Sequence, residues 1–220
     1  MLKDLNLADN LLFDLDGTLS DNSDGIIGGV MYALDKYGIP YGDRESLKKF
    51  IGPPLTRSFE EHCGFSRAEA LEIIEVYREY FRERGIFENV LYDGVPEMLA
   101  ELKTAGKKLF IATSKPEPFA RRIAEKFGIN GFFEYICGSE LDGSRELKSD
   151  VITFIIEKFG LKRDRTLMIG DRHHDIEGAL KCGISSMGVL YGFGSREELT
   201  SAGAGWLAES PGDVREKLLQ

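Results

Sequence analysis

The chain has 220 residues, of which 42% are hydrophobic and 30% are charged. These proportions are typical of a globular protein that buries roughly 70% of its unfolded surface and needs no disulfides to hold it together. A net charge of −9 argues against a broad contact with the phosphate backbone of a nucleic acid. A metal ion or a few local cations could still attract a small anion.

Neither the N-terminal residues nor the cysteines point to an extracellular protein. The first ten residues, MLKDLNLADN, lack the apolar core of a signal peptide, and no apolar run approaches the roughly 18 residues of a membrane span. Cys63, Cys137 and Cys182 are widely spaced and form no CxxC pair, so we expect buried thiols in a reducing compartment. The sequence therefore predicts a soluble cytoplasmic protein that does not bind membranes.

The first apolar run, LLFDLDGTL at residues 11–19, contains Asp14 and Asp16 two residues apart. On a β-strand such residues point to the same face. Two adjacent carboxylates repel each other, and neither gains from burial unless a positive charge offsets them. A bound cation is one explanation, and it would need further ligands elsewhere in the chain.

The segment from about residue 22 to residue 88 has helical apolar spacing, and none of it is typical of a strand. Helices are expected at 22–38, 43–52, 53–64 and 66–85. Such a helical block after the first strand indicates an insertion that caps one edge of a sheet. We therefore expect a helical cap domain at 20–89 and a core domain formed by 1–19 and 90–220.

From residue 90 onward the expected elements alternate between helix and strand. Helices are expected at 95–106, 118–128, 149–160, 175–183 and 211–219. Strands are expected at 108–114, 132–138, 166–171 and 185–192, with an edge strand at 204–208. This alternation predicts an α/β fold in which a parallel sheet carries helices on both faces. Ligands of such sheets bind at the carboxyl ends of the strands.

Four groups of polar residues fall at these strand ends or helix starts. They are Asp14 and Asp16 with Gly17 and Thr18, then Thr113, Ser114 and Lys115, then Lys148, and finally Asp171 and Asp175. The carboxylates suit Mg²⁺, which prefers oxygen ligands, and the hydroxyl groups and lysine suit the outer oxygens of a phosphoryl group. A carboxylate can attack phosphorus to form an aspartyl-phosphate, while a neighbouring acid protonates the leaving oxygen and then activates water.

In order and across nearly the whole chain, FDLDGTL, IATSK, Lys148 and GDRHHD resemble the four motifs of the haloacid dehalogenase superfamily. The resemblance is strongest to its DxDGT phosphatases with a helical cap after the first motif, and among these to the phosphoglycolate phosphatase-like branch. It implies a Rossmann-like, doubly wound core and Mg²⁺-dependent hydrolysis of a small phosphomonoester, such as phosphoglycolate, a nucleoside monophosphate or a sugar phosphate. Asp16 counts against the dehalogenases of the superfamily, which lack this second aspartate.

The resemblance also implies roles for individual residues. Asp14 matches the nucleophile and a metal ligand, and Asp16 matches the general acid and base, with its backbone carbonyl on the metal. Lys148 matches the lysine that neutralises the charge of the nucleophile and the phosphoryl group. The other matches are Thr113 as the hydroxyl of the second motif, Asp171 and Asp175 as metal ligands, and Ser114, Gly17 and Thr18 as phosphate-binding or loop residues.

Several of these residues have other interpretations. Lys115 competes with Lys148 for the role of the cation in the site. Asp171 and Asp175 could instead cap the helix that follows them, which is compatible with metal binding.

Two further features have simpler explanations. His173 and His174 suggest a transition metal, but Mg²⁺ sites favour oxygen, so we expect them to shape the loop. Arg57, in FIGPPLTRSF at residues 50–59, could contact a second polar group of the substrate. A solvated arginine on a helix is the simpler interpretation of Arg57.

Three other functions fit parts of the pattern. A phosphomutase of the β-phosphoglucomutase kind shares all four core motifs, but residues 50–59 resemble the phosphatase branch more closely. A signalling receiver also uses a phosphorylated aspartate, a threonine and a lysine, yet in another order and without a long helical insertion. A catalytically silent binding protein would be expected to lack a motif residue, and none is missing. The sequence indicates neither the substrate nor the oligomeric state.

Overall fold

A computed structural model describes residues 2, 4–142 and 144–220. The chain divides into two compact units. One unit comprises Met1–Ser20 and Leu91–Gln220, and the other comprises Asp21–Val90. We call the first the core unit and the second the helical unit.

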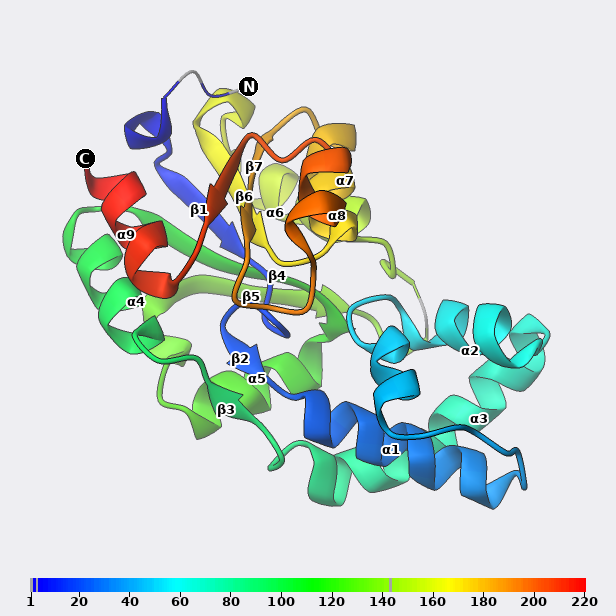
Figure 1. The fold of residues 1–220 in the computed structure, drawn as a ribbon. Helices are drawn as coiled ribbons and strands as arrows, with labels where there is room; N and C mark the ends of the chain where they lie inside the picture. The colour runs from blue at the N-terminus through cyan, green and yellow to red at the C-terminus, as the bar shows by residue number, and fades with distance from the viewer. Residues whose placement is uncertain (1, 3, 143) are drawn as a thin grey trace. The chain divides into compact units, whose positions relative to one another are not determined.

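The core unit is built on a six-stranded parallel sheet with the strand order β5-β4-β1-β6-β7-β8 (Figure 1). The strands are β1 (Asn10–Phe13), β4 (Lys108–Pro116), β5 (Phe133–Ser139), β6 (Thr166–Gly170), β7 (Ser185–Val189) and β8 (Trp206–Ala208). In the central strand β1, Leu11 pairs with Leu109 of β4 on one side and Leu167 of β6 on the other. The predicted α/β fold with a parallel sheet is confirmed.

Helices cover both faces of this sheet (Figure 1). They are α4 (Val95–Thr104), α5 (Glu117–Lys126), α6 (Lys148–Phe159), α7 (His173–Lys181), α8 (Arg196–Ser201) and α9 (Pro211–Leu219), with short 3₁₀ turns at Leu5–Leu7, Asn130–Phe132 and Arg163–Arg165. Helices α4 and α9 pack together, and α6 packs against α7. The chain winds from β1 outward to β5 and then crosses back to β6, so the strand order reverses beside β1, where α/β sheets bind their ligands.

The core strands are apolar on both faces because helices bury both sides of the sheet. All four residues of β1 are buried. On the face covered by α6 and α7, Leu12, Phe110 and Met168 of three neighbouring strands pack against Ile152 and Ala179. This packing fixes the strands from whose carboxyl ends the polar residues project.

The helical unit contains three α-helices. These are α1 (Ser23–Lys36), α2 (Leu55–Cys63) and α3 (Arg67–Tyr80), together with a 3₁₀ helix at Glu45–Phe50 (η2) and a π-helical turn at Phe81–Gly85 (η3). Helix α3 packs against both α1 and α2. Gly25 and Gly85 allow the backbones of α1 and η3 to approach closely, since a Cβ on Gly25 would lie 2.1 Å from the Gly85 carbonyl oxygen.

Some elements differ from the sequence prediction. The helix expected at 43–52 is a shorter 3₁₀ helix, the strand expected at 185–192 ends at Val189, and α8 was not predicted. The two-residue strands β2 (Ser20–Asp21) and β3 (Val90–Leu91), which pair with each other, were also missed. Strands this short carry too few residues for an alternating pattern to show in the sequence.

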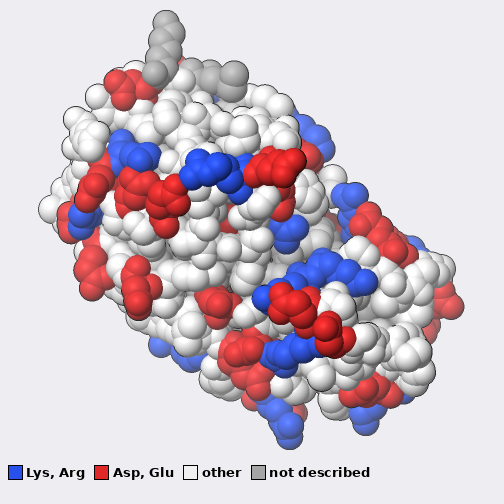
Figure 2. All heavy atoms as spheres, in the orientation of Figure 1, with Lys and Arg blue, Asp and Glu red and all other residues white. Residues whose placement is uncertain are grey.

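The surface charges and the cysteines match the expectations from the sequence only in part. Acidic and basic side chains are interspersed over the face seen in Figure 2. All three cysteines are free thiols, but the expectation that all would be buried was wrong for Cys63, which is partly exposed near the end of α2. Among the described residues, no helix is both long and apolar enough to cross a bilayer.

Candidate active site

The core unit brings the four predicted polar groups to one edge of its sheet. Asp14 follows the last residue of β1, and Asp171 follows the last residue of the neighbouring strand β6. Thr113 lies near the end of β4, on the other side of β1, and Lys148 is the first residue of α6. The prediction that these residues share the carboxyl edge agrees with their positions in the fold.

Lys148 lies between two carboxylates. Its Nζ is 2.9 Å from Oδ1 of Asp14 and 2.8 Å from Oδ1 of Asp175, and it donates to the Ala112 carbonyl at 2.9 Å. The lysine side chain is only 4% exposed. Burial by itself lowers the pKa of Lys148, but the two carboxylates outweigh it and hold this pKa above its usual value. The lysine is therefore charged and held toward Asp14.

Asp14, Asp171 and Asp175 form a buried acidic cluster in which one oxygen from each lies within 4.8 Å of the others. Burial, together with the charges of Asp175 and Asp14, raises the pKa of Asp171 well above its usual range. Burial also raises the pKa of Asp175, to about 6, although Lys148 opposes the rise. Carboxyl groups whose ionised form is destabilised in this way are suitable ligands for a divalent cation that prefers oxygen, such as Mg²⁺.

Asp16 does not share a face of β1 with Asp14. The expectation of two neighbouring carboxylates on one strand was wrong, because β1 ends at Phe13 and the chain turns through Gly17, whose φ is +82°. Oδ2 of Asp16 lies 2.9 Å from Nζ of Lys115, which is also buried. Asp14 and Asp16 thus contact different lysines. When all four carboxylates are ionised, the two lysines leave two negative charges, which a divalent cation would balance.

The end of β4 departs from regular strand geometry. Ala112 pairs with Cys137 and Pro116 with Ser139, so β4 places three residues between these pairs where β5 places one. Such a bulge redirects side chains and is common next to active sites. The backbone N–H of Lys115 donates to Oγ1 of Thr113 at 3.2 Å, which fixes the hydroxyl group at the sheet edge.

Comparison with known proteins places these residues in a family. The family model of haloacid dehalogenase-like hydrolases matches residues 11–189, most of the chain. The chain belongs to the haloacid dehalogenase-like hydrolase family. This confirms the resemblance seen in the motifs, and the predicted enzyme class, a phosphatase of this family, is confirmed with it.

Several relatives are similar over most of the chain. A protein of Pseudomonas aeruginosa named 5′-nucleotidase is 48% identical over 86% of each chain, and a phosphoglycolate phosphatase of Vibrio parahaemolyticus is 27% identical over 94% of each. The tyrosine-protein kinase PtkA of Mycobacterium tuberculosis is 40% identical over 84% of this chain, which spans 62% of that protein. The crystal structure of a predicted phosphatase from Clostridium acetobutylicum is 46% identical, with a TM-score of 0.94 over 96% of this chain and 98% of that one.

A loop after β7, at residues 190–194, packs against Gly17, Thr18 and Asp171, and the motifs gave no sign of it. Asp171 accepts hydrogen bonds from the backbone N–H of Phe193 at 2.9 Å and from the hydroxyl group of Thr18 at 3.3 Å. The Tyr191 hydroxyl donates to the Thr18 carbonyl at 3.0 Å. A Cβ on Gly192 would lie 2.2 Å from the Gly17 carbonyl oxygen, so the loop needs glycine there. The glycines of YGFG at 191–194 were the sequence signal that could have revealed this loop.

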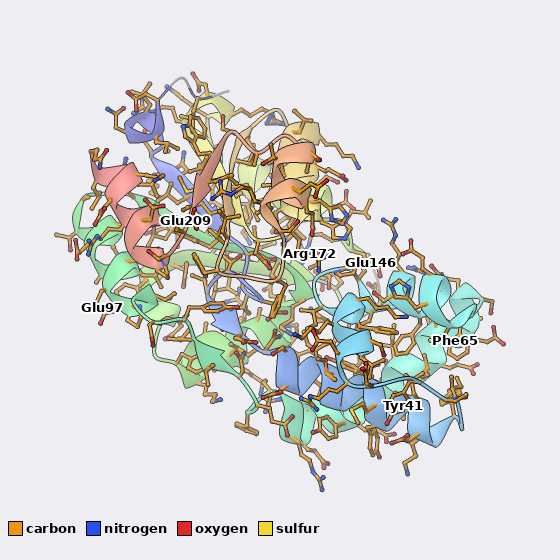
Figure 3. The ribbon with its side chains drawn as sticks, viewed as in Figure 1. Tyr41, Phe65, Glu97, Glu146, Arg172 and Glu209 are labelled. Carbon is orange, nitrogen blue, oxygen red and sulfur yellow. The ribbon has the colours of Figure 1, made fainter. Side chains whose placement is uncertain are left out.

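The turn between Asp171 and Asp175 is held by Glu198 of α8. Oε1 of Glu198 accepts from the His173 backbone N–H and the Arg172 side chain, each at 2.9 Å, and lies 2.8 Å from Nδ1 of His173; Arg172 is labelled in Figure 3. Burial alone would raise the pKa of Glu198, but these contacts lower it to about 2. His173 therefore contributes to the shape of the loop, as expected. Glu198 was missed because α8 itself was not predicted.

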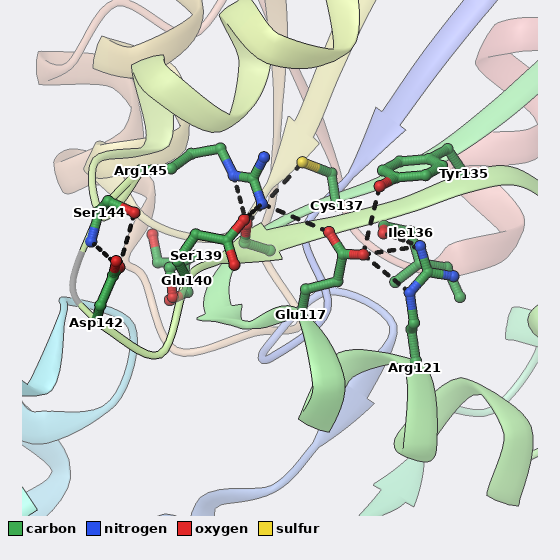
Figure 4. Close-up of polar contacts among 12 residues, drawn as sticks. Glu117, Arg121, Tyr135, Ile136, Cys137, Ser139, Glu140, Asp142, Ser144 and Arg145 are labelled. Atoms are coloured by element: carbon green, nitrogen blue, oxygen red, sulfur yellow. Dashed lines mark hydrogen bonds and ion pairs between the residues drawn. The ribbon is translucent and has the colours of Figure 1, made fainter. Parts of the chain in front are cut away.

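The loop that leads from β5 to Lys148 is held by Arg145 (Figure 4). Its guanidinium donates to the Gly138 carbonyl at 2.9 Å, pairs with Glu140 and lies 3.6 Å from Glu117. It also sits 4.3 Å from the ring centre of Phe154, on the helix that begins with Lys148. Arg145 has a φ of +51°, which is costly for a residue with a side chain. This network connects the end of β5 to α6 and so supports the position of Lys148.

Arg57 is not part of the core unit. It lies on α2 of the helical unit, where its Nε is 2.6 Å from Oε1 of Glu61 and its side chain is 54% exposed. The sequence prediction that Arg57 contacts the substrate therefore stays a prediction.

Ser114, unlike Arg57, belongs to the core unit. It lies in β4, and its carbonyl accepts a hydrogen bond from the Ser139 hydroxyl group at 2.9 Å.

Proposed function

We propose that this chain is a Mg²⁺-dependent phosphatase that hydrolyses a small phosphomonoester through an aspartyl-phosphate on Asp14. The observation that carries the proposal is the placement of Asp14 within a buried acidic cluster and against the charged Lys148. The cation would be held by Asp14, Asp171, Asp175 and the backbone carbonyl of Asp16. When bound, Mg²⁺ would supply positive charge for the phosphoryl oxygens and reduce repulsion between them and the nucleophile.

The residues of the chain would carry out two displacements. Oδ1 of Asp14 accepts the Leu15 N–H at 2.7 Å and contacts Lys148, so Oδ2 is the oxygen presented for attack. As the bond from Asp14 to phosphorus forms and the bond to the leaving oxygen breaks, Asp16 gives its proton to that oxygen. Asp16 then takes a proton from water as the water oxygen attacks phosphorus, which releases inorganic phosphate and restores Asp14.

Other residues would bind the phosphoryl group during both displacements. Lys148 balances the charge of the nucleophile and the phosphoryl oxygens. The hydroxyl group of Thr113 and the hydroxyl group and backbone N–H of Ser114 would donate hydrogen bonds to those oxygens. These donors are fixed by the sheet edge before the substrate arrives, so little reorganisation is needed in the transition state. The Gly17 N–H and the Thr18 hydroxyl group donate instead to the Ser20 carbonyl and to Asp171, and so shape the loop after Asp14.

The names of two relatives support a substrate class. Their names, 5′-nucleotidase and phosphoglycolate phosphatase, favour a nucleoside monophosphate or phosphoglycolate over a sugar phosphate that is isomerised, so hydrolysis is favoured over the mutase. We also propose that the helical unit acts as a cap domain and that Arg57 on α2 contacts the part of the substrate beyond the phosphate. Closure of such a cap would exclude water from the first displacement.

The proposal is tested by release of inorganic phosphate from a panel of nucleoside monophosphates, phosphoglycolate and sugar phosphates with Mg²⁺. Asp14→Asn should abolish turnover, whereas Asp164→Asn, at an exposed position of the core unit, should leave it unchanged. Rapid quenching with acid during turnover should trap labelled phosphate on the wild-type chain and none on Asp14→Asn. Substantial phosphate release by Asp14→Asn would exclude Asp14 as the nucleophile.

A further inference from the structure

A second buried lysine, Lys115, lies in the candidate active site. It is not one of the predicted catalytic residues, which are Asp14, Asp16, Thr113 and Lys148. Its side chain is 6% exposed, and its Nζ is 2.9 Å from Oδ2 of Asp16, whose side chain is 12% exposed. A buried ammonium group and a buried carboxylate are both costly without a partner. The pair is therefore an integral part of the site.

The backbone that carries Lys115 is fixed from two sides. Its N–H is bound to Thr113 within the bulge of β4, and the neighbouring Ser114 carbonyl is bound to Ser139 of β5. Gly138 of β5 lies so close that a Cβ on it would be 2.2 Å from the Lys115 carbonyl oxygen. The side chain thus starts from a rigid position, and its ammonium group can act as a fixed point.

Lys148 and Lys115 serve different carboxylates. Lys148 contacts Asp14 and Asp175, which under the proposed function are the nucleophile and a metal ligand. Lys115 contacts Asp16, the residue that exchanges a proton with the leaving group and with water. Proton transfer needs a heavy-atom distance of about 2.6–3.2 Å and good alignment, so a carboxyl group that rotates freely is often out of position.

We propose that Lys115 is a positioning residue that holds one oxygen of Asp16 in place, so that the other oxygen stays aligned with the oxygen of the leaving group. The inference rests on the proposed function, because it requires Asp16 to be the general acid. In the step concerned, the bond from phosphorus to the leaving oxygen breaks and the proton of Asp16 moves to that oxygen. Lys115 neither gives nor takes a proton in this step.

The leaving group provides a test, because p-nitrophenolate departs without protonation whereas an alkoxide does not. Lys115→Met should lower kcat/KM for an alkyl phosphomonoester by about 10²-fold, and for p-nitrophenyl phosphate by less than about fivefold. The parameter kcat/KM is used because it reports the first displacement, in which the leaving group departs. The alkyl substrate is whichever of the nucleoside monophosphates or phosphoglycolate the wild type hydrolyses.

A double-mutant cycle shows whether Lys115 acts through Asp16 or contributes to catalysis independently of it. Asp16→Asn should show the same preference for the aryl substrate, and adding Lys115→Met to it should cause little further loss, since Lys115 acts through Asp16. Lys115→Arg retains the charge and should recover part of the alkyl activity. Lys108→Met, at the exposed start of the same strand, is the control and should match the wild type.

Three outcomes would overturn the inference. Equal losses on both substrates, with weaker inhibition by inorganic phosphate, would make Lys115 a phosphate ligand. Additive losses in the cycle would also exclude action through Asp16. A lowered unfolding temperature with an unchanged ratio of alkyl to aryl activity would leave only a structural role, and if Lys115→Met does not fold, the same ratio is measured in Lys115→Arg. A wild type inactive on every phosphomonoester would instead contradict the proposed function.

Discussion

Charged side chains are arranged in opposite ways in the two units. At the carboxyl edge of the sheet in the core unit, buried partners come from distant parts of the chain, as Lys148 and Asp14 do. In the helical unit, ion pairs such as Arg57 with Glu61 are exposed, and several join residues one helical turn apart. Removal of one partner from a buried pair typically costs about 3–5 kcal/mol, whereas an exposed pair contributes about 0–1 kcal/mol.

Under the proposed function, this difference separates the residues that carry out the chemistry from those that select the substrate. In the core unit, Lys148 is paired with both Asp14 and Asp175, so a change at one of these positions affects the other two. An exposed residue of the helical unit can change alone, with little effect on folding. A family that keeps one reaction and varies its substrates would be expected to vary such exposed residues, because function resides in the site and not in the fold.

The largest contrast between the units is expected for two lysines. Lys148→Met leaves Asp14 and Asp175 buried without their ammonium partner and should lower the free energy of unfolding by about 3–5 kcal/mol. Lys48→Met removes an exposed pair with Glu45 in the helical unit and should lower it by less than about 1 kcal/mol. Urea unfolding at neutral pH measures both values. Similar losses in the two variants would contradict the proposed difference between the units.

The next prediction is an increase in stability, for a variant of Asp171. Because burial and like charges raise the pKa of Asp171, its ionised form destabilises the metal-free protein at neutral pH. Asp171→Asn should therefore raise Tm without metal, by about 2–4 °C for each kcal/mol in a chain of this size. It should also reduce the rise in Tm on adding Mg²⁺, which in the wild type corresponds to about 2.7 kcal/mol at 100 times Kd.

Asp9 supplies the control for this experiment. A side-chain hydrogen bond from Arg165 lowers the pKa of Asp9, so its ionised form is favoured in the folded state. Asp9→Asn should lower Tm slightly, by the equivalent of at most about 1 kcal/mol, because the pair is half exposed. An Asp171→Asn variant that unfolds below the wild type in the presence of a chelator would show that the acidic cluster is not under electrostatic strain.

A smaller effect depends on pH. The pKa of Glu198 falls from 4.5 to about 2 in the folded state, so its contribution to stability is complete above pH 4.5 and is lost as the pH falls toward 2. Glu198→Gln should lower the free energy of unfolding by about 1 kcal/mol at pH 7, a value reduced for partial exposure. The difference from the wild type should shrink below pH 4.5 in urea unfolding series. A constant difference would exclude the charge of Glu198 as its cause.

The sequence predicted which polar residues meet at the carboxyl edge of the sheet, because parallel strands impose a strong pattern. Asp14, Asp171 and Lys148 each follow an apolar strand or begin a helix, and parallel strands bring such positions together. The strand ends were less accurate, and so was the geometry of Asp16, because no pattern marks where the backbone leaves β1 to turn through Gly17.

Contacts between distant side chains were out of reach of sequence patterns. In the sequence, nothing indicates that Lys115 pairs with Asp16. That contact depends on the bulge at the end of β4, which is seen only in the structure. Glu198 and Arg145 are ordinary charged residues in the sequence, and only the packing of their loops brings them to the turns that they hold. Local periodicity carries no information on such long-range partners. In the helical unit the helices were largely predicted, but their exposed residues follow the same spacing whether or not they contact a substrate.

The smallest expected effect tests the helical unit itself. Arg57→Ala should change the free energy of unfolding by less than about 0.5 kcal/mol, since the side chain is exposed. If Arg57 contacts the substrate beyond its phosphate, kcat/KM should fall by about tenfold for the preferred natural phosphomonoester and stay unchanged for p-nitrophenyl phosphate, which lacks that group. Glu61→Gln removes the partner of Arg57 but keeps the guanidinium, so it should retain activity on both substrates. Equal activity of Arg57→Ala and wild type on the natural substrate would identify Arg57 as a solvated residue of α2, and the determinants of specificity would then have to lie elsewhere.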